Sequence, residues 1–267
     1  MERKANEMTV IVMTYFNRKF QLIKTLESFL RYSPNEFSVV IVDDGSTEEL
    51  VLPKYPFEVK ILTMQNKTWI MGDPAWNTGF RYALLKNPEI IIVQNAECLH
   101  VGDVLGYAQK VTDKSYISFG CLSLDKGTTF GNGNTAILAE ELLRREHLAA
   151  NEDGQLAWYN HPIHFARGYH FCSAITAKNL IKLNGFDERY SDGRAFDDND
   201  FLHRINCLGL QMEITAEPRV FHQWHYSTPL PPNQAELYTR NENLFNEVLK
   251  SNNYKAVHTI TPDLCGI

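Results

Sequence analysis

Apolar runs and amphipathic stretches alternate along the first hundred residues, and this alternation restricts the fold more than any other feature. Short, apolar, largely β-branched runs are typical of strands buried on both faces, and they lie at Thr9–Thr14, Ser38–Val42, Val59–Met64 and Glu89–Val93. Apolar residues at helical spacing predict helices at Phe20–Arg31 and Asn77–Lys86. Strands joined by single helices form parallel sheets with right-handed crossovers, so the sequence predicts an α/β fold with a mostly parallel sheet flanked by helices.

Polar clusters follow the predicted strands. They are Thr14–Asn17 (TYFN), Asp43–Ser46 (DDGS) and Gln94–Glu97 (QNAE). Because ligands of open α/β sheets bind beyond the carboxyl ends of the strands, we expect these clusters to share one edge of the sheet. Asp-Gly-Ser is also ordinary turn chemistry, but it follows a buried strand directly, which favours nucleotide recognition over a simple turn.

A second polar site is predicted where the segment GFDERYSDGRAFDDNDFLHRI becomes a helix. Asp197, Asp198 and Asp200 fall in the first turn, where free N–H groups and the helix dipole favour carboxylates. Arg204 follows Asp200 at a spacing that pairs the two side chains on one helix face. Carboxylates this close raise one another's pKa, which suits one of them to act as a general base. The alternative is a solvated, capped helix start.

Composition argues against several classes of protein. Lys and Arg total 26 against 32 Asp and Glu, a net charge of −6 that disfavours nonspecific nucleic-acid binding. No apolar run approaches the roughly 20 residues that cross a bilayer, and we expect neither a transmembrane segment nor a signal peptide. The five scattered cysteines form no CxxC pair and predict reduced thiols in a cytoplasmic protein, with peripheral membrane attachment left open. No GxGxxG follows a strand, which argues against a dehydrogenase.

Taken in order, the segments TYFN, VVIVDDGST, NTG, QNAE, GFDERY and DDNDFLHRI resemble glycosyltransferase family 2, from about Thr9 to His225. The resemblance implies the GT-A fold, in which a Rossmann-like nucleotide-binding half merges with an acceptor-binding half. It implies an enzyme that transfers a sugar from a nucleotide-diphosphate donor with inversion, helped by a divalent metal. We therefore expect one domain over residues 1–230, with the nucleotide-binding half at about 8–100 and the acceptor half at about 101–230. A C-terminal helix and tail follow at 231–267.

The resemblance also implies roles for the acidic helix start. Asp198 matches the family's general base, and Asp197 stands beside it where the family has an acid that orients the acceptor. Asp200 and Arg204 are expected to anchor the helix.

For nucleotide binding the resemblance implies seven residues, namely Thr14, Tyr15, Phe16, Asp43, Asp44, Asn77 and Arg81. Asp44 is the first choice for contact with the base. The order of Tyr15 and Phe16 departs from the family, so which ring stacks on the base stays open. Trp76 replaces the family's Arg, so a phosphate contact is assigned to Arg81, with core packing as the alternative for Trp76.

The metal site departs most from the family, whose D-x-D motif ends the fourth strand. Glu97 is the one charged ligand kept there, His222 follows a later strand where many GT-A enzymes place a His ligand, and His225 is a reserve. Imidazole with carboxylate suits Mn²⁺ better than Mg²⁺, so we expect a divalent metal with Mn²⁺ preferred. Ordinary core or surface histidines are the alternative, as is a metal-free site with cationic side chains.

Aromatic and cationic residues crowd the segment LAWYNHPIHFARGYH. Aromatic faces stack on the C–H surfaces of sugars, so Trp158 and His161 are expected to contact the donor or acceptor sugar, with ordinary packing as the alternative.

The sequence therefore predicts an inverting glycosyltransferase in polysaccharide assembly. Its partners are a nucleotide-sugar donor, with UDP-sugars favoured, and a saccharide or lipid-linked acceptor; the oligomeric state is open. Two alternatives stay open. A catalytically degenerate GT-A domain, binding a sugar nucleotide or serving as a scaffold, is favoured by the altered D-x-D. A nucleotidyltransferase is disfavoured because TYFNRK lacks the glycines of a phosphate loop.

Overall fold

The computed structural model describes residues 8–32, 36–131, 157–227, 231–257 and 260. In chain order its elements are β1 (Thr9–Tyr15), α1 (Lys19–Phe29), β2 (Phe37–Asp43), β3 (Glu58–Thr63), α2 (Asp73–Leu84), β4 (Ile90–Gln94), β5 (Cys98–Val101), α3 (Val104–Ala108), β6 (Ser115–Ser123), α4 (Lys126–Phe130), β7 (Ala157–Asn160), β8 (Cys172–Thr176), α6 (Ala177–Leu183), the 3₁₀ turn η1 (Glu188–Tyr190), α7 (Asp197–Cys207), β9 (Gln211–His222) and α8 (Gln234–Val248). The outer ends of the expected domain and tail, at 1–7 and 261–267, lie outside the described residues.

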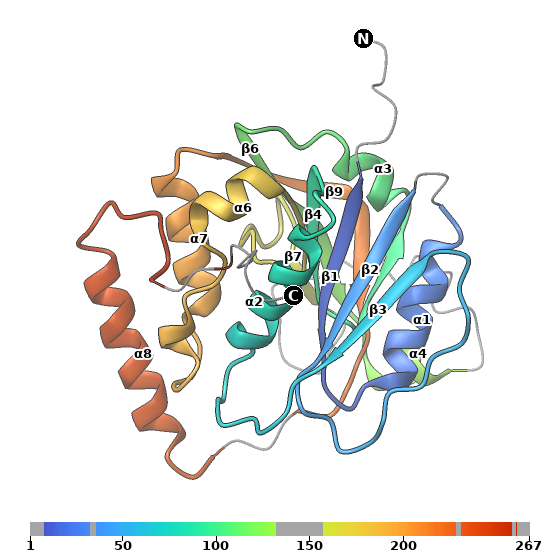
Figure 1. The fold of residues 1–267 in the computed structure, drawn as a ribbon, viewed down its shortest axis with the longest axis horizontal. Coiled ribbons are helices and arrows are strands. Elements are labelled where there is room, and N and C mark those ends of the chain that lie inside the picture. Colours follow the sequence, from blue (N-terminus) through green and yellow to red (C-terminus); the bar gives the residue numbers. More distant parts are fainter. Residues whose placement is uncertain (1–7, 33–35, 132–156, 228–230, 258–259, 261–267) are drawn as a thin grey trace.

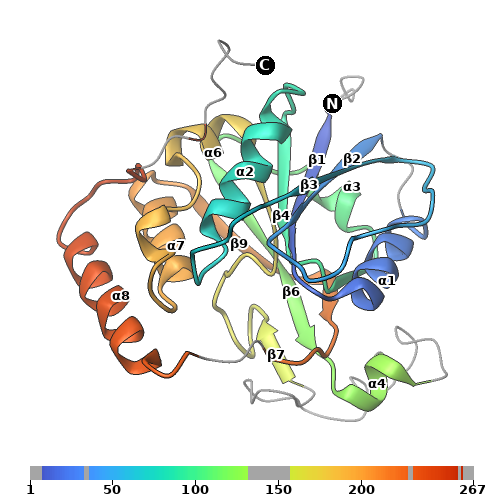
Figure 2. The same cartoon turned by 60° about the horizontal axis from the view of Figure 1, so that its bottom comes forward.

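In the described part of the chain the strands form one nine-stranded sheet, in the order β3-β2-β1-β4-β8-β6-β9-β5, with β7 paired to β6. Figures 1 and 2 show this sheet running through the molecule. The strands β3, β2, β1 and β4 are parallel, as the alternation of strands and helices predicts. β8 then pairs antiparallel with both β4 and β6, so the first and second halves of the chain share a single sheet. The predicted α/β architecture is confirmed.

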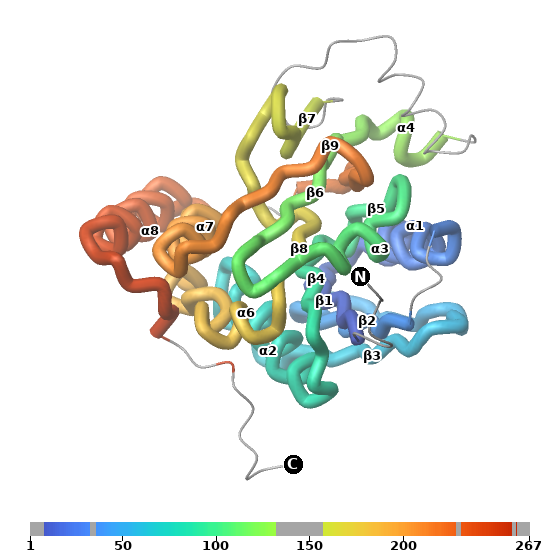
Figure 3. The backbone as a smooth tube through the Cα atoms, turned by 90° about the horizontal axis from the view of Figure 1, so that it is seen from above, coloured from blue at the N-terminus to red at the C-terminus, as the bar shows by residue number. Residues whose placement is uncertain are grey.

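Helices cover both faces of the sheet. Leu22 and Leu26 of α1 pack with Ile11 and Met13 on one face, where α3 also lies. α2, α6 and α7 cover the other face around Val10 and the neighbouring strands. Seen from above, the strands lie between these two groups of helices, and α8 lies outside α7 (Figure 3). Period-two alternation in β1 thus supplies apolar side chains to two separate cores.

The helix α2 begins at Asp73, earlier than the expected start at Asn77. Pro74 occupies the first turn, where its fixed φ and missing N–H cost nothing, and this explains the earlier start. Asn77 therefore lies inside the helix and is fully buried.

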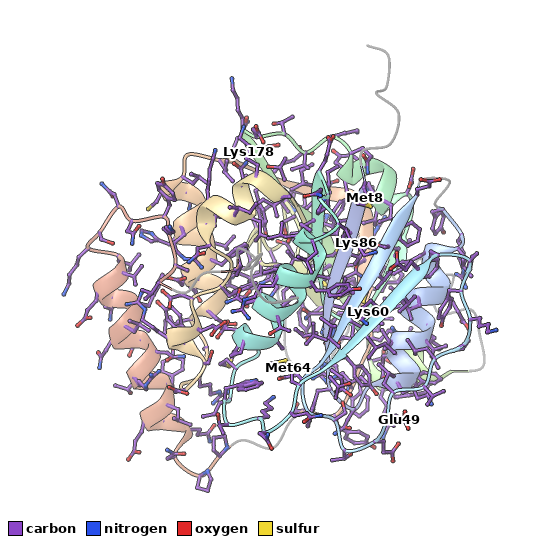
Figure 4. All side chains as sticks on the ribbon, in the orientation of Figure 1. Met8, Glu49, Lys60, Met64, Lys86 and Lys178 are labelled. Carbon is purple, nitrogen blue, oxygen red and sulfur yellow. The ribbon has the colours of Figure 1, made fainter. Side chains whose placement is uncertain are left out.

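Strand β3 forms one edge of the sheet. Its outward side carries charged residues: Lys60 lies over the ring of Tyr82, and Lys86 donates to Glu58 (Figure 4). Charged side chains on an edge strand disfavour pairing with another chain. Among the described residues, no helix combines the length and the apolar character that crossing a membrane requires.

Candidate functional site

The loops that follow β1 and β2 are joined at the carboxyl ends of these strands. The N–H of Asp44 donates to the carbonyl of Tyr15 (2.8 Å), and the N–H of Asn17 donates to Oγ of Ser46 (3.0 Å). The side chain of Asn17 accepts in turn from the N–H of Thr47 (3.0 Å). These contacts confirm that the TYFN and DDGS clusters share one edge of the sheet.

Asp44 is held by two side chains from the loop after β3. Trp69 Nε1 donates to Oδ1 of Asp44 (2.8 Å), and Lys67 Nζ donates to Oδ2 (2.5 Å). Asp43 closes its own turn by accepting from the N–H of Ser46 (2.9 Å). The sequence analysis missed Lys67 and Trp69; their place after the third parallel strand was the available signal.

The two candidate stacking rings have different surroundings. Tyr15 is 5% exposed and packs in the core beneath α1. Phe16 is half-buried, with the ammonium of Lys67 lying 5.3 Å from its ring centroid. Thr14 is also half-buried, and alternation along β1 places it on the face opposite Tyr15. Of the two rings, Phe16 is therefore the one accessible from the loops.

Asn77 and Arg81 face the second half of the chain. Asn77 Nδ2 donates to the carbonyl of Phe186 and to Glu188 (both 2.9 Å), and Asn77 Oδ1 accepts from the N–H of Phe186 (2.9 Å). Arg81 lies in the last turn of α2, with Nη2 3.4 Å from Glu188 Oε1. Because α2 returns toward the amino ends of the parallel strands, its last turn points away from Asp44. The two side chains fasten the GFDE turn to α2, which favours a structural role over the nucleotide contacts expected of them.

Trp76 packs in the core, which is the alternative that the sequence analysis gave for it. Its side chain stacks with Phe80 and Phe186 and meets the edge of His170 at 5.3 Å. A Cβ on Gly72 would lie 4.0 Å both from Oδ2 of Asp44 and from Cδ1 of Trp76. The start of α2 thus connects the Asp44 loop to the surroundings of His170.

The acidic residues at the start of α7 differ in burial: Asp200 is buried, whereas Asp198 is partly exposed. Asp200 is buried and accepts from Nε of Arg204 (2.6 Å), which confirms the predicted pair. Arg204 Nη1 also donates to the carbonyls of Leu183 and Gly185 (both 2.9 Å), so the pair ties α7 to the turn after α6.

The side chain of Asp198 is 33% exposed. Its Oδ1 lies 2.6 Å from Nδ1 of His170, a buried residue enclosed by Phe186 and Phe201. Burial lowers the pKa of His170, but the charge of Asp198 and the hydrogen bond to it outweigh burial, and the pKa is raised. The imidazole of His170 thus lies directly against the carboxylate of Asp198. The sequence analysis included His170 in an aromatic segment but did not assign it to Asp198.

The carboxylates of Asp197 and Asp73 also interact electrostatically. Burial, followed by the charge of Asp198, raises the pKa of Asp197 to about 7. Asp73, at the start of α2, is fully buried, and burial together with Asp197 raises its pKa well above the usual range. Neighbouring carboxylates whose surroundings separate their protonation states are typical of acid–base sites.

Glu97, His222 and His225 come together although they are far apart in sequence, and their ligand atoms lie within 4.8 Å of one another. Glu97 follows β4, and His222 ends β9, where it pairs with Cys98 of β5. Oε1 of Glu97 lies 3.2 Å from Nε2 of His222 and 3.5 Å from Nε2 of His225. The structure thus confirms that these three residues form one cluster.

This donor set fits a divalent cation. Burial lowers the pKa of His222, which favours the neutral imidazole that a metal requires. Burial alone would raise the pKa of Glu97, but Arg18 and the two histidines hold it well below its usual range. One carboxylate with two imidazoles is a donor set that divalent first-row metals accept.

Two further residues, both missed from the sequence, hold the cluster. Arg18, directly after β1, donates from Nη1 to Oε1 of Glu97 (2.6 Å). Gln223 is positioned by hydrogen bonds to two segments: its N–H and its Nε2 both donate to the carbonyl of Glu97 (3.1 Å), and Nε2 also donates to the carbonyl of Gln21 in α1 (3.0 Å). These contacts join the ends of β4 and β9 to α1.

Trp158 and His161 are buried in this structure. Trp158 packs with Leu122 and Phe221, and its ring lies 4.3 Å from that of His161. Nδ1 of His161 accepts from the N–H of Ile163 (3.2 Å), and burial lowers the pKa of His161 to about 4. The burial of both rings favours the packing alternative over the expected contact with a sugar.

Solved structures share this fold. A mannosyltransferase from Pyrobaculum calidifontis, PcManGT in complex with GDP-Man and Mn²⁺, superposes with a TM-score of 0.54 at 15% identity, covering 92% of this chain and 64% of that one. Residues 1–349 of S. aureus TarS, in complex with UDP-GlcNAc, give 0.53 at 13% identity, covering 84% and 60%. At these identities the likeness establishes the fold, which is GT-A, as expected.

Sequence comparison gives the family. A Haemophilus influenzae protein described as an uncharacterized glycosyltransferase is 24% identical over 204 residues, covering 74% of this chain and 62% of that protein. The chain therefore spans less than two thirds of the length of this relative and of the two structures above. The profile of glycosyl transferase family 2 matches residues 10–168, more than half of the chain. The protein belongs to glycosyl transferase family 2.

Proposed function

We propose that this chain is an inverting glycosyltransferase that moves a sugar from a nucleotide-diphosphate donor to an acceptor hydroxyl. The observation that carries the proposal is the meeting of a metal-ligand cluster with the Asp44 loop. Asn17 bonds the loop after β2, and its neighbour Arg18 bonds Glu97. In this proposal a nucleotide held at Asp44 places its diphosphate near Glu97, His222 and His225.

The nucleotide is assigned to the loops after β1, β2 and β3. Asp44 contacts the base, with Lys67 and Trp69 fixing its carboxylate. Phe16 provides the accessible ring, while Thr14, Asp43 and the buried Tyr15 shape the strand ends around it. UDP-sugars are the favoured donors in this proposal, and a saccharide or a lipid-linked saccharide in polysaccharide assembly is the acceptor.

Glu97, His222 and His225 would hold the metal, with Mn²⁺ preferred over Mg²⁺. When bound, a divalent cation supplies positive charge that stabilises the departing diphosphate. Asp198 takes the proton of the acceptor hydroxyl, because its carboxylate is partly exposed and oriented by His170. Asp197 orients the acceptor beside it. Trp158, His161, Asn77 and Arg81 have structural roles.

The test is transfer from a panel of nucleotide sugars to saccharide acceptors with and without Mn²⁺, preceded by a thermal-shift screen. Ligand binding stabilises the fold by mass action, so a matching donor raises the melting temperature. We expect one nucleotide class to stabilise the protein, and NMR of the product to show an inverted anomeric configuration. A retained configuration would contradict the assignment of Asp198 as base.

Asp44→Ala should weaken nucleotide binding by roughly 1–3 kcal/mol, because a buried polar partner is left unsatisfied. Calorimetric titration with the stabilising nucleoside diphosphate measures this loss. Glu49→Ala, an exposed acid beyond the same loop, is the matched control and should bind normally. Unchanged affinity in a folded Asp44→Ala protein would place the base elsewhere.

Glu97→Gln and His222→Ala should each weaken Mn²⁺ binding and reduce metal-dependent transfer, because each removes one ligand atom from the cluster. Isothermal titration with Mn²⁺ and activity after chelation are the two measurements. His164→Ala changes an exposed histidine outside the cluster and serves as the control. Full activity in the presence of a chelator would contradict the metal assignment. It would indicate that cationic side chains bind the diphosphate instead.

The second candidate function is a catalytically degenerate GT-A domain that binds a sugar nucleotide. Two observations favour it: Glu97 is the one acidic residue in the segment Gln94–Glu97 at the end of β4, and its carboxylate is already paired with Arg18. Nucleotide binding without transfer to any acceptor in the panel would support this alternative.

A further inference from the structure

The carboxylate oxygen that would face a metal is already occupied by a cation. Nη1 of Arg18 lies 2.6 Å from Oε1 of Glu97. The same oxygen is the one that lies 3.2 Å from Nε2 of His222 and 3.5 Å from Nε2 of His225. The guanidinium and a divalent cation would therefore bind the same atom from the same small volume.

Burial makes this overlap consequential. The Glu97 side chain is 3% exposed, whereas that of Arg18 is 25% exposed and reaches the cluster from the solvent side. A buried carboxylate without a counter-charge is strongly destabilising, so the apo site needs a cation near Glu97. The charges of a divalent metal and of the guanidinium repel one another at short range in a low-dielectric site.

We propose that Arg18 is the built-in counter-cation of the metal site, which pairs with Glu97 while the site is empty and is displaced from Oε1 when a divalent cation binds. This inference rests on the proposed function only in taking Glu97, His222 and His225 as the metal ligands. Arg18 begins the chain segment leading into α1, where the N–H of Leu22 donates to its carbonyl, so its backbone stays fixed while its side chain moves. Arg18 is thus a positioning residue that lowers metal affinity in the absence of donor.

The experiment measures Mn²⁺ affinity of the full chain without nucleotide, by electron paramagnetic resonance of free Mn²⁺. Arg18→Gln should bind Mn²⁺ at least about tenfold more tightly than the unaltered protein, a difference of about 1.4 kcal/mol. Loss of a merely structural contact would change affinity in the opposite direction. Arg18→Lys keeps the charge and should restore the weaker binding.

Lys24→Gln is the matched control, because Lys24 lies in α1, the helix that Arg18 precedes, but donates to the carbonyl of Thr129, outside the cluster. It should bind Mn²⁺ as the unaltered protein does. Glu97→Gln in the Arg18→Gln background should abolish the tight binding; tight binding that survives without Glu97 places the ion elsewhere and overturns the inference.

Equal or weaker Mn²⁺ binding by a folded Arg18→Gln protein also overturns the inference, and leaves the glycosyltransferase proposal standing. Tighter binding in a chain that transfers no sugar supports the inference and removes only the proposed activity. Absence of Mn²⁺ binding in every variant overturns both the counter-cation and the metal assignment. A thermal melt of each variant confirms that the affinities are those of folded protein.

Discussion

We expect Asp198→Asn to lower the rate of sugar transfer by at least about a hundredfold, the lower range for removal of a general base. Asparagine keeps the size of the side chain and still faces His170, but it cannot take a proton. Donor binding should change little, because Asp198 is assigned to the acceptor. Single-turnover transfer and calorimetric donor titration separate the two effects.

Asp197→Asn tests the role of the neighbouring carboxylate. Because burial and the charge of Asp198 raise the pKa of Asp197 to about 7, this carboxylate can exchange a proton near neutral pH. In our assignment it orients the acceptor, so its loss should raise the KM for the acceptor more than it lowers kcat. Near-normal turnover of Asp198→Asn, with a large kcat loss in Asp197→Asn, would exchange the two roles. If neither variant affects transfer, the helix start is a solvated cap.

Arg204→Ala should lower the free energy of unfolding by about 3–5 kcal/mol, the cost of leaving a buried charge unpaired. The substitution removes the partner of Asp200 and the donors to the carbonyls of Leu183 and Gly185. Burial raises the pKa of Asp200, and Arg204 offsets this only in part, so the unpaired acid would take up a proton more readily. Urea unfolding followed by circular dichroism measures the effect.

Two controls test that interpretation. Lys178→Ala breaks an exposed pair with Asp113, and such pairs contribute little to stability. The double variant Asp200→Leu, Arg204→Met replaces the buried pair by apolar residues and should recover much of the lost stability. A loss below about 1 kcal/mol in Arg204→Ala would show that the pair does not anchor α7.

Local patterns were sufficient to predict the elements of the first half. β-branched runs predicted β1 to β4, and the acid-rich sequence predicted the start of α7 at Asp197. The cluster of Glu97 with two histidines was predicted because the family pattern relates distant segments. The predicted start of α2 at Asn77 was wrong because a local motif was read without its packing: the helix begins at Asp73.

The contacts that complete the site were beyond sequence reasoning for a physical reason. Arg18 meets Glu97, Lys67 meets Asp44, and His170 meets Asp198 across long separations in the chain. No periodicity relates such partners, because their proximity follows from strand order and from the loops that leave each strand. A single charged residue in a loop has too many possible partners for its sequence to select one.

The direct pairing of β4 with β8 has a consequence for how new specificities could be engineered or evolve. Ile90 to Gln94 pair residue by residue with Thr176 to Cys172, so one continuous stretch of sheet joins the first and second halves of the chain. The elements that carry the Asp44 loop and Asp198 are therefore anchored on the same sheet. Loops at the strand ends can be exchanged to suit another sugar, while the same rigid frame keeps the reacting groups in register.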